Sequence, residues 1–198
     1  SKEGTRYLDF TSGIGVTSLG HSHPSLISAL KNQAEKIWHC SNLFKIENQQ
    51  IVADKITTNT FAESVFFCNS GTEAVEAGIK AIRKYFSDKD KKKFNIICAK
   101  NAFHGRTYAA ISASGKSKLT DGFEPVLKGF KQVEFNDSKD VSKNIDKETA
   151  AIMIETVQGE GGITPAKKQY LRDLQKMSDD NDILLFFDEV QCGVGRTG

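Results

Sequence analysis

An uninterrupted apolar run, Ile183 to Phe187, ends in two acidic residues, Asp188 and Glu189. A short apolar run of this kind is typical of a strand that is buried on both faces of a parallel sheet. Open α/β sheets place their ligands at the carboxyl ends of such strands. An acid at this point can act in catalysis, bind a metal or mark the exit of the chain to solvent. The run alone does not decide among these three roles.

Strand-like and helix-like segments alternate along the chain. Strands are expected at Tyr7 to Phe10, Val65 to Cys68, Asn95 to Ala99, Ala151 to Ile154 and Ile183 to Phe187. Helices are expected from Pro24, from Glu47 to Thr58, after Ser70 and from Pro165. This alternation predicts a three-layer α/β/α fold with a mainly parallel sheet.

Apolar side chains at helical spacing predict the inner face of each helix. These faces consist of Leu26, Ile27, Leu30, Ala34 and Ile37; of Ile51, Val52 and Ile56; of Val75, Ile79, Ile82 and Phe86; and of Tyr170, Leu171, Leu174 and Met177. The paired histidines His21 and His23 precede Pro24 and are interpreted as a turn entering the first helix, with no metal site.

The composition is that of a soluble globular protein, with 38% hydrophobic and 26% charged residues. The net charge of +2 is too small to favour nucleic acid or a membrane surface as a partner. No run reaches the length of a transmembrane helix. None of Cys40, Cys68, Cys98 and Cys192 forms a C-x-x-C pair, so we interpret them as buried thiols of a reducing compartment.

The stretch Ser70-Gly71-Thr72-Glu73 turns a predicted strand into a helix. In one interpretation it is a capping box, in which Ser70 caps the helix and Glu73 reaches back. The same turn presents backbone N–H groups and a hydroxyl at the positive end of the helix, which suits a phosphate. A nucleotide P-loop is disfavoured because the Walker lysine is missing.

Two further loops follow predicted strands. In the first, Phe103 can stack on a planar ligand and Arg106 can bind a carboxylate, while His104 is also compatible with an ordinary loop histidine. The second, from Glu155 to Gly162, combines two acids with three glycines, which is typical of a shaped loop rather than a passive linker.

Taken in order, the motifs GHSHP, NSGTEAVE, FHGRT, E-x-x-QGEGG and FDEVQCGVGRTG resemble the class III (ornithine-type) aminotransferases. These are fold-type I enzymes that use pyridoxal 5'-phosphate (PLP). The opening LDFTSGIGVTSLGHSHP and the segment WHCSN resemble the acetylornithine branch of the family. The resemblance covers essentially the whole chain. It implies transamination between N-acetylornithine and 2-oxoglutarate, giving glutamate, by a cytoplasmic homodimer of arginine biosynthesis.

The resemblance also assigns roles by matched position. The cofactor residues would be Ser70, Gly71 and Thr72 around the phosphate, Phe103 and Val190 on the two faces of the pyridine ring, Asp188 beside its nitrogen and Gln191 near its phenolic oxygen. The substrate residues would be Arg106 for the α-carboxylate, Glu160 for the choice of amino donors over glutamate, and Glu155 in a role left open. A buried carboxylate beside the ring nitrogen favours the protonated ring, which PLP needs as an electron sink.

The chain departs from the family pattern in three places. Thr156 stands where proline is common, and Cys192 stands where threonine is common. The lysine that forms the Schiff base in the family lies on a later strand, and no lysine here matches it. We therefore expect an N-terminal segment at residues 1–45, a partial large PLP-binding domain at residues 46–198, and no appreciable transaminase activity from this chain alone.

Two alternatives stay open. One is a different class III specificity: ornithine, succinylornithine or 4-aminobutyrate. Arg106 disfavours 4-aminobutyrate, because that compound has no α-carboxylate. The other is a non-catalytic protein, either a truncated pseudoenzyme or a binding module that keeps the phosphate loop without the lysine.

Overall fold

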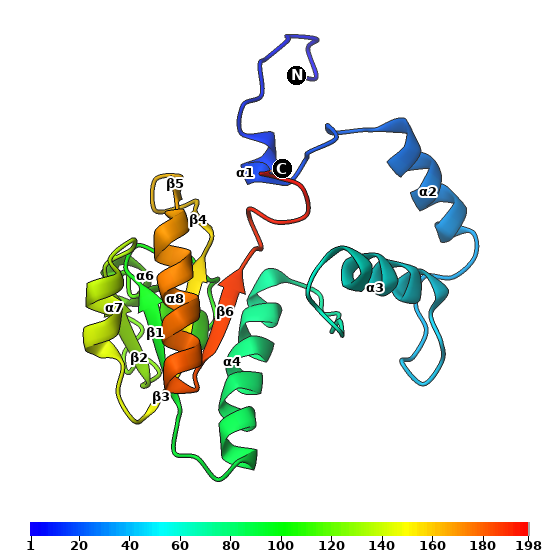
Figure 1. Ribbon diagram of the computed structural model, residues 1–198. Helices are drawn as coiled ribbons and strands as arrows, with labels where there is room; N and C mark the ends of the chain where they lie inside the picture. Colours follow the sequence, from blue (N-terminus) through cyan, green and yellow to red (C-terminus); the bar gives the residue numbers. More distant parts are fainter. Residues whose placement is uncertain (198) are drawn as a thin grey trace. The chain divides into compact units, whose positions relative to one another are not determined.

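The computed structural model describes residues 1–197, which divide into two compact units, residues 1–67 and the residues from Cys68 onward. The first unit contains three helices, α1 (Ser12–Gly15), α2 (Pro24–Ala34) and α3 (Glu47–Asn59). The second contains the sheets and the remaining helices (Figure 1). The expected domain boundary between residues 45 and 46 stays a prediction.

The strand expected at Tyr7 to Phe10 is not formed, so that prediction is wrong. The Asp9 carboxylate instead accepts hydrogen bonds from the backbone N–H groups of Thr11, at 2.9 Å, and Ser12, at 2.8 Å. Such local side-chain bonds stabilise a turn in place of a strand ladder. The chain therefore bends directly into α1.

Helix α2 begins at Pro24 as predicted, and His23 caps it by accepting from the Ser25 N–H at 3.3 Å. This confirms the interpretation of this histidine as part of a turn entering the helix. The predicted inner faces of α2 and α3 are not buried: Leu30 is 72% exposed and Ile51 is 46% exposed. The burial expected of these two faces is therefore wrong within the described residues.

The sheet of the second unit has the strand order β2-β1-β3-β6, and every neighbouring pair is parallel. Its strands are β1 (Asn95–Ala99), β2 (Phe130–Val133), β3 (Thr149–Glu155) and β6 (Leu184–Asp188). In a parallel sheet the carboxyl ends of all strands lie at the same end of the sheet, which we call its carboxyl edge. The predicted fold class is confirmed.

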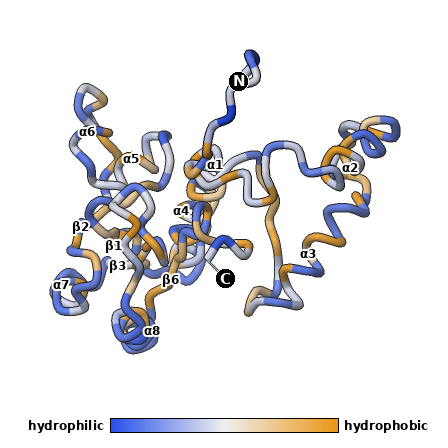
Figure 2. Tube along the Cα trace, turned by 90° about the horizontal axis from the view of Figure 1, so that it is seen from above, coloured by the Kyte–Doolittle hydropathy of each residue, from blue (hydrophilic) through white to orange (hydrophobic). Residues whose placement is uncertain are grey.

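Helices cover both faces of this sheet. They are α4 (Gly71–Asp88), α5 (Tyr108–Ser114), α6 (Ser117–Thr120), α7 (Ser138–Asn144) and α8 (Lys168–Asn181). One core cluster joins α4 and α5 to Ile96 and Cys98, while the other joins α7 and α8 to Ile97 and Ala99. Successive residues of β1 therefore face opposite layers, as the period of a strand requires. Figure 2 shows the apolar strands between the two helical layers.

The inner faces predicted for α4 and α8 are largely confirmed. All four predicted residues of α4 are buried: Val75, Ile79, Ile82 and Phe86. In α8, Tyr170 and Leu174 are buried, and Leu171 and Met177 are partly buried against the same cluster.

Two strand predictions need correction. The run ending in Asp188 is not buried on both faces: β6 lies at an edge of the sheet, and Leu184 to Phe187 are partly buried. The fully buried strand is β3, which has a neighbour on each side. Val65 to Cys68 joins no sheet among the described residues, and Phe66 is 76% exposed. Strand-like composition without a pairing partner does not form a strand.

Pro165 does not open α8. It lies in the two-residue strand β5 (Thr164–Pro165), which pairs antiparallel with β4 (Val157–Gln158), and the helix begins only at Lys168. The Ala166 N–H donates to the Thr156 carbonyl at 2.9 Å, which extends this hairpin beyond the proline. The backbone around Pro165 and Ala166 thus belongs to the hairpin, and the helix begins after it.

The buried-thiol interpretation is confirmed for Cys98 and Cys192. It is wrong for Cys68, which is exposed, and for Cys40, which is only partly buried. Burial raises the pKa of the Cys98 thiol. Among the described residues, no helix combines the length and the apolar character needed to cross a membrane.

Candidate active site

The acid pair Glu155 and Asp188 marks the centre of the site. The two residues are register partners at the ends of β3 and β6, and their exposures are 5% and 6%. Asp188 therefore does not simply mark the exit of the chain to solvent. Two carboxylates buried side by side at the carboxyl edge of a parallel sheet stand where a ligand site is expected.

Asp188 is held by His104. The Nδ1 atom of His104 lies 2.7 Å from Oδ2 of Asp188, and both side chains are buried. A hydrogen bond to a carboxylate requires the proton on Nδ1, so this nitrogen is the donor. The other oxygen, Oδ1, accepts from the Val190 N–H at 3.1 Å. The carboxylate is therefore fixed in orientation from two sides.

His104 is the loop histidine whose role the sequence left open, and the structure places it beside Asp188. It lies in the loop after β1, and its own N–H donates to Ser114 Oγ at 3.2 Å. Its Nε2 is buried and has no partner among the described residues. A buried nitrogen without a partner is uncommon, so Nε2 is available to a further hydrogen-bonding group at this site. The available signal was its place after β1, since that loop reaches the same sheet edge as Asp188.

Glu155 differs from Asp188 in its surroundings. Its Oε2 accepts from the Phe103 N–H at 3.2 Å. Burial raises the pKa of Glu155, the charge of Asp188 adds to the increase, and His104 and the Phe103 N–H oppose it. One buried carboxyl thus favours its protonated form, beside another that a histidine holds.

The Ser70 turn caps α4. Ser70 Oγ accepts from the Glu73 N–H at 3.2 Å, and Glu73 Oε2 accepts from the Asn69 N–H at 2.5 Å. The capping box is therefore formed, although Glu73 reaches Asn69 rather than Ser70. An 18-residue helix begins here, and its N-terminus carries partial positive charge. Capping and anion binding are compatible at this turn.

Two glycines show how closely the site loops approach one another. A Cβ on Gly71 would lie 2.6 Å from Cγ1 of Val190, and a Cβ on Gly105 would lie 2.0 Å from Oγ1 of Thr72. No side chain larger than hydrogen fits at either position without displacement. The start of α4, the loop after β1 and the loop after β6 therefore meet at one place.

The loop after β3 lies against the loop after β6. A Cβ on Gly159 would lie 1.6 Å from Oε1 of Gln191, so the Gln191 side chain lies directly against the Gly159 backbone. Both loops leave neighbouring strands at the same edge of the sheet. The structure therefore adds the loop after β3, through Gly159, to the set of loops that includes Val190 and Gln191.

The remaining predicted residues, Phe103, Arg106 and Glu160, are less buried than Glu155 and Asp188. Phe103 is half-buried, and the guanidinium carbon of Arg106 lies 5.6 Å from its ring centroid, which is within the range of a cation–π contact. Arg106 itself is exposed. Glu160 is also exposed, and within residues 1–197 no hydrogen bond joins its side chain to the other site residues. Of the predicted substrate residues, the structure therefore places Glu155 beside Asp188 and leaves Arg106 and Glu160 at the surface.

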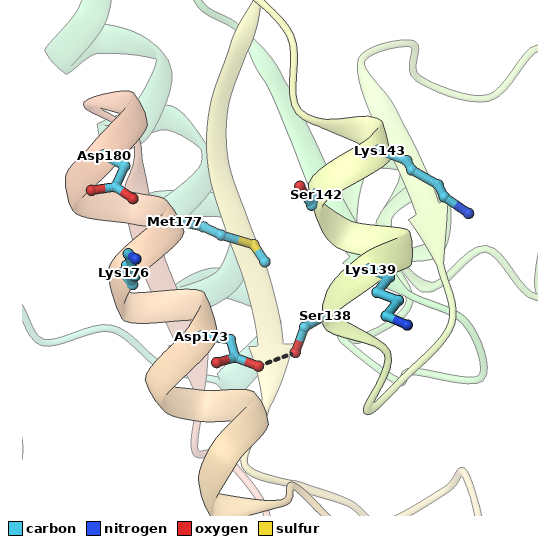
Figure 3. A pocket seen from close by; sticks show the side chains of 8 residues that line it. All are labelled: Ser138, Lys139, Ser142, Lys143, Asp173, Lys176, Met177 and Asp180. Carbon is cyan, nitrogen blue, oxygen red and sulfur yellow. Dashed lines mark hydrogen bonds between the residues drawn. The ribbon is translucent and has the colours of Figure 1, made fainter.

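A separate cavity of about 550 Å³ lies between α7 and α8 (Figure 3). It is lined by Ser138, Lys139, Ser142, Lys143, Asp173, Lys176, Met177 and Asp180. The Ser138 hydroxyl donates to Asp173 Oδ2 at 2.6 Å across it. None of the predicted site residues lines this cavity. Within the described part of the chain, no three His, Cys, Asp or Glu side chains cluster as a metal site.

The family model for class-III aminotransferases matches residues 1–198. The chain belongs to the class III aminotransferase family. It is 51% identical to an acetylornithine aminotransferase of Agrobacterium fabrum (strain C58) over 199 residues, covering 100% of this chain and 50% of that protein. This class III chain thus spans about half the length of the curated relatives that it matches.

Solved structures agree with this membership. The N-acetylornithine aminotransferase of Stenotrophomonas maltophilia K279a is 36% identical, with a TM-score of 0.83, covering 98% of this chain and 49% of that one. An ornithine aminotransferase of Toxoplasma gondii is 30% identical, with a TM-score of 0.91, covering 97% of this chain and 46% of that one. The latter was crystallised with oxidized glutathione and holds PLP at partial occupancy in its active site. The class III chain therefore shares its fold with an enzyme that holds PLP in its active site.

Proposed function

We propose that this chain forms the cofactor-binding part of a PLP-dependent aminotransferase that transfers the δ-amino group of N-acetylornithine to 2-oxoglutarate, giving glutamate. The observation that carries the proposal is the buried pair of His104 and Asp188, at 2.7 Å, at the carboxyl edge of the sheet. The 51% identity to an acetylornithine aminotransferase supports the choice of amino donor.

The residues present fit the cofactor. Asp188 offers a buried carboxylate for the ring nitrogen, and a carboxylate in low dielectric attracts a cation strongly. The N-terminus of α4, with Ser70, Gly71 and Thr72, suits the phosphate. The contact of Gly71 with Val190 supports a common pocket for ring and phosphate. When bound, PLP supplies an electron sink for the carbanion formed at the substrate.

The chain's own residues would prepare the site as follows. His104 donates to Asp188 and so orients the carboxylate that holds the proton on the ring nitrogen. Phe103 and Val190 would enclose the two faces of the ring and exclude water from it, and Gln191 would donate to the phenolic oxygen. These roles follow the family pattern, and the closeness of the loops supports them.

On the substrate side, we propose that Arg106 binds the α-carboxylate, because a guanidinium matches a carboxylate with two parallel hydrogen bonds. Glu160 would set the preference for amino donors over glutamate, and the role of Glu155 stays open. Its raised pKa makes it a candidate to hold a proton beside the ligand. A cytoplasmic homodimer of arginine biosynthesis is part of the same proposal.

The decisive experiment uses a protein of the relatives' length that contains these 198 residues, which we call the complete enzyme. We expect kcat/KM with 2-oxoglutarate to be highest for N-acetylornithine and lower for ornithine, succinylornithine and 4-aminobutyrate. A higher value for one of those three would assign the other class III specificity. Absence of PLP binding to the complete enzyme, followed by absorbance, would favour the non-catalytic alternative.

A further inference from the structure

Three side chains join the loop after β3 to the loop after β6. The Thr156 hydroxyl donates to Oε1 of Glu189 at 2.7 Å and lies 3.1 Å from Sγ of Cys192. The thiol in turn lies 3.7 Å from Oε2 of Glu189. We call Thr156, Glu189 and Cys192 the Thr156 cluster.

The cluster lies one residue beyond the acid pair. Thr156 follows Glu155 and Glu189 follows Asp188, and those two acids are the last register partners of β3 and β6. The backbone pairing of the two strands ends there, so the cluster continues the connection through side chains. Without it, two loops would leave the sheet edge with one fewer tie between them.

Each loop is also fixed on its own side of the cluster. The Thr156 carbonyl accepts from the Ala166 N–H at 2.9 Å, which ties Thr156 to the β4-β5 hairpin. The Glu189 carbonyl accepts from the Gly193 N–H at 2.8 Å, which closes the turn containing Val190 and Gln191. The Thr156 hydroxyl therefore connects two loops that each carry a backbone hydrogen bond of their own, so loss of this hydroxyl would affect both.

Both positions at which the chain departs from the family pattern in these loops meet in this contact. A proline at position 156 has no hydroxyl and could not reach Glu189 or residue 192 in this way. The cysteine at position 192 is 6% exposed and places its sulfur against that hydroxyl. The two departures are therefore coupled in space rather than independent.

We propose that Thr156, Glu189 and Cys192 are positioning residues that hold Val190 and Gln191 in place for the cofactor. The inference rests on the proposed function, because the side chains that it positions are those assigned to PLP. Loss of the Thr156 hydroxyl would let the turn after Asp188 shift away from Gly159, against which Gln191 lies.

The test measures PLP affinity and thermal melting of the complete enzyme after the cofactor has been removed. For Thr156→Val, which keeps the branched shape without the hydroxyl, we expect PLP affinity to fall by about five- to tenfold, the effect of losing one partly exposed hydrogen bond to a carboxylate. The apo-protein should melt within about 2 °C of the wild type, because the β3–β6 backbone pairing remains.

Two variants separate positioning from general damage. Thr156→Ser keeps the hydroxyl and should restore the affinity to within about twofold of the wild type. Thr164→Val makes the same change on β5, at an exposed threonine outside the cluster, and should leave the affinity unchanged. In a double-mutant cycle, Thr156→Val combined with Glu189→Ala should bind PLP no more weakly than the worse single variant, since both remove the same interaction.

Different results would overturn the positioning role and the proposed function. Equal affinities for the wild type, Thr156→Val and Thr156→Ser would overturn the positioning role and leave the proposed function intact. Additive losses in the double variant, or a lowered apo-protein melting temperature without rescue by serine, would reduce the cluster to a structural role. A wild-type complete enzyme that binds no PLP would overturn the proposed function and this inference with it.

Discussion

The Nδ1 atom of His104 and the Oδ2 atom of Asp188 lie 2.7 Å apart, although the two residues are 84 positions apart in the sequence. The parallel sheet makes this contact possible, because the loop after β1 and the end of β6 lie at the same edge of the sheet. The histidine fixes an acid whose carboxylate otherwise has, among residues 1–197, the Val190 N–H as its hydrogen-bond donor. The pair therefore connects the fold to the proposed chemistry.

Replacing His104 by alanine should destabilise the complete enzyme and weaken PLP binding together. The buried carboxylate would lose its charged-group hydrogen bond, which typically costs about 2–3 kcal/mol in the free energy of unfolding. His104→Asn, whose side-chain N–H can donate in place of Nδ1, should recover part of both losses. Urea unfolding and PLP titration measure the two effects. An alanine variant as stable as the wild type would show that Asp188 does not need this partner.

Gly105 should tolerate alanine poorly. It has φ +119°, and a Cβ there would lie 2.0 Å from Thr72 Oγ1. Gly122 is the matched control, because it also has a positive φ, +79°, but a Cβ there would meet nothing within 4 Å. Both alanine variants carry backbone strain of about 1–3 kcal/mol, and the larger φ of Gly105 and its collision with Thr72 both make Gly105→Ala the less stable variant. Gly105→Ala should be less stable by urea unfolding and should bind PLP less tightly. Equal stability of the two variants would contradict the close approach of these loops.

Glu155 should make stability depend on pH in a definite direction. Its pKa in the folded protein is raised above the usual 4.5, so folding favours the protonated form. The stabilising contribution is fully present below pH 4.5 and is lost as the pH rises through the folded-state pKa. Glu155→Gln mimics the protonated form, so it should raise the melting temperature of the apo-protein at pH 7.

That gain should shrink as the pH falls toward 4.5, where the wild-type carboxyl is itself protonated in the fold. Glu63→Gln, a change at an exposed glutamate, serves as the control and should show no such trend. If Glu155→Gln instead makes the protein less stable than the wild type at pH 7, the ionised carboxylate is the form that the fold favours.

More of the fold than of the site can be predicted from the sequence. Local patterns predicted α4, β1 and the turn at Ser70, because helical spacing and capping are properties of neighbouring residues. Strand β2 was not predicted, because it contains Lys131 and Gln132. These side chains find partners only in the folded chain: Lys131 with Asp146, and Gln132 with the Ala113 carbonyl.

The contact of His104 with Asp188 escaped prediction for a related reason. Nothing next to His104 in sequence distinguishes it from a solvent-facing histidine, and only the strand order β2-β1-β3-β6 brings its loop to the acid. The edge position of β6 was missed for the same reason, since an apolar run does not reveal how many neighbours a strand has.

The 198-residue chain alone should not transaminate. The family's reaction needs a lysine that attacks the cofactor and moves a proton, and no lysine of this chain matches its position. Lys100, which follows β1, pairs with Glu134 and is exposed. We expect steady turnover with N-acetylornithine and 2-oxoglutarate only from the complete enzyme, measured as glutamate formed at equal protein concentration. Sustained glutamate production by the purified 198-residue chain would require a lysine here to take that role, and single replacement of Lys100 by arginine would then test the nearest candidate.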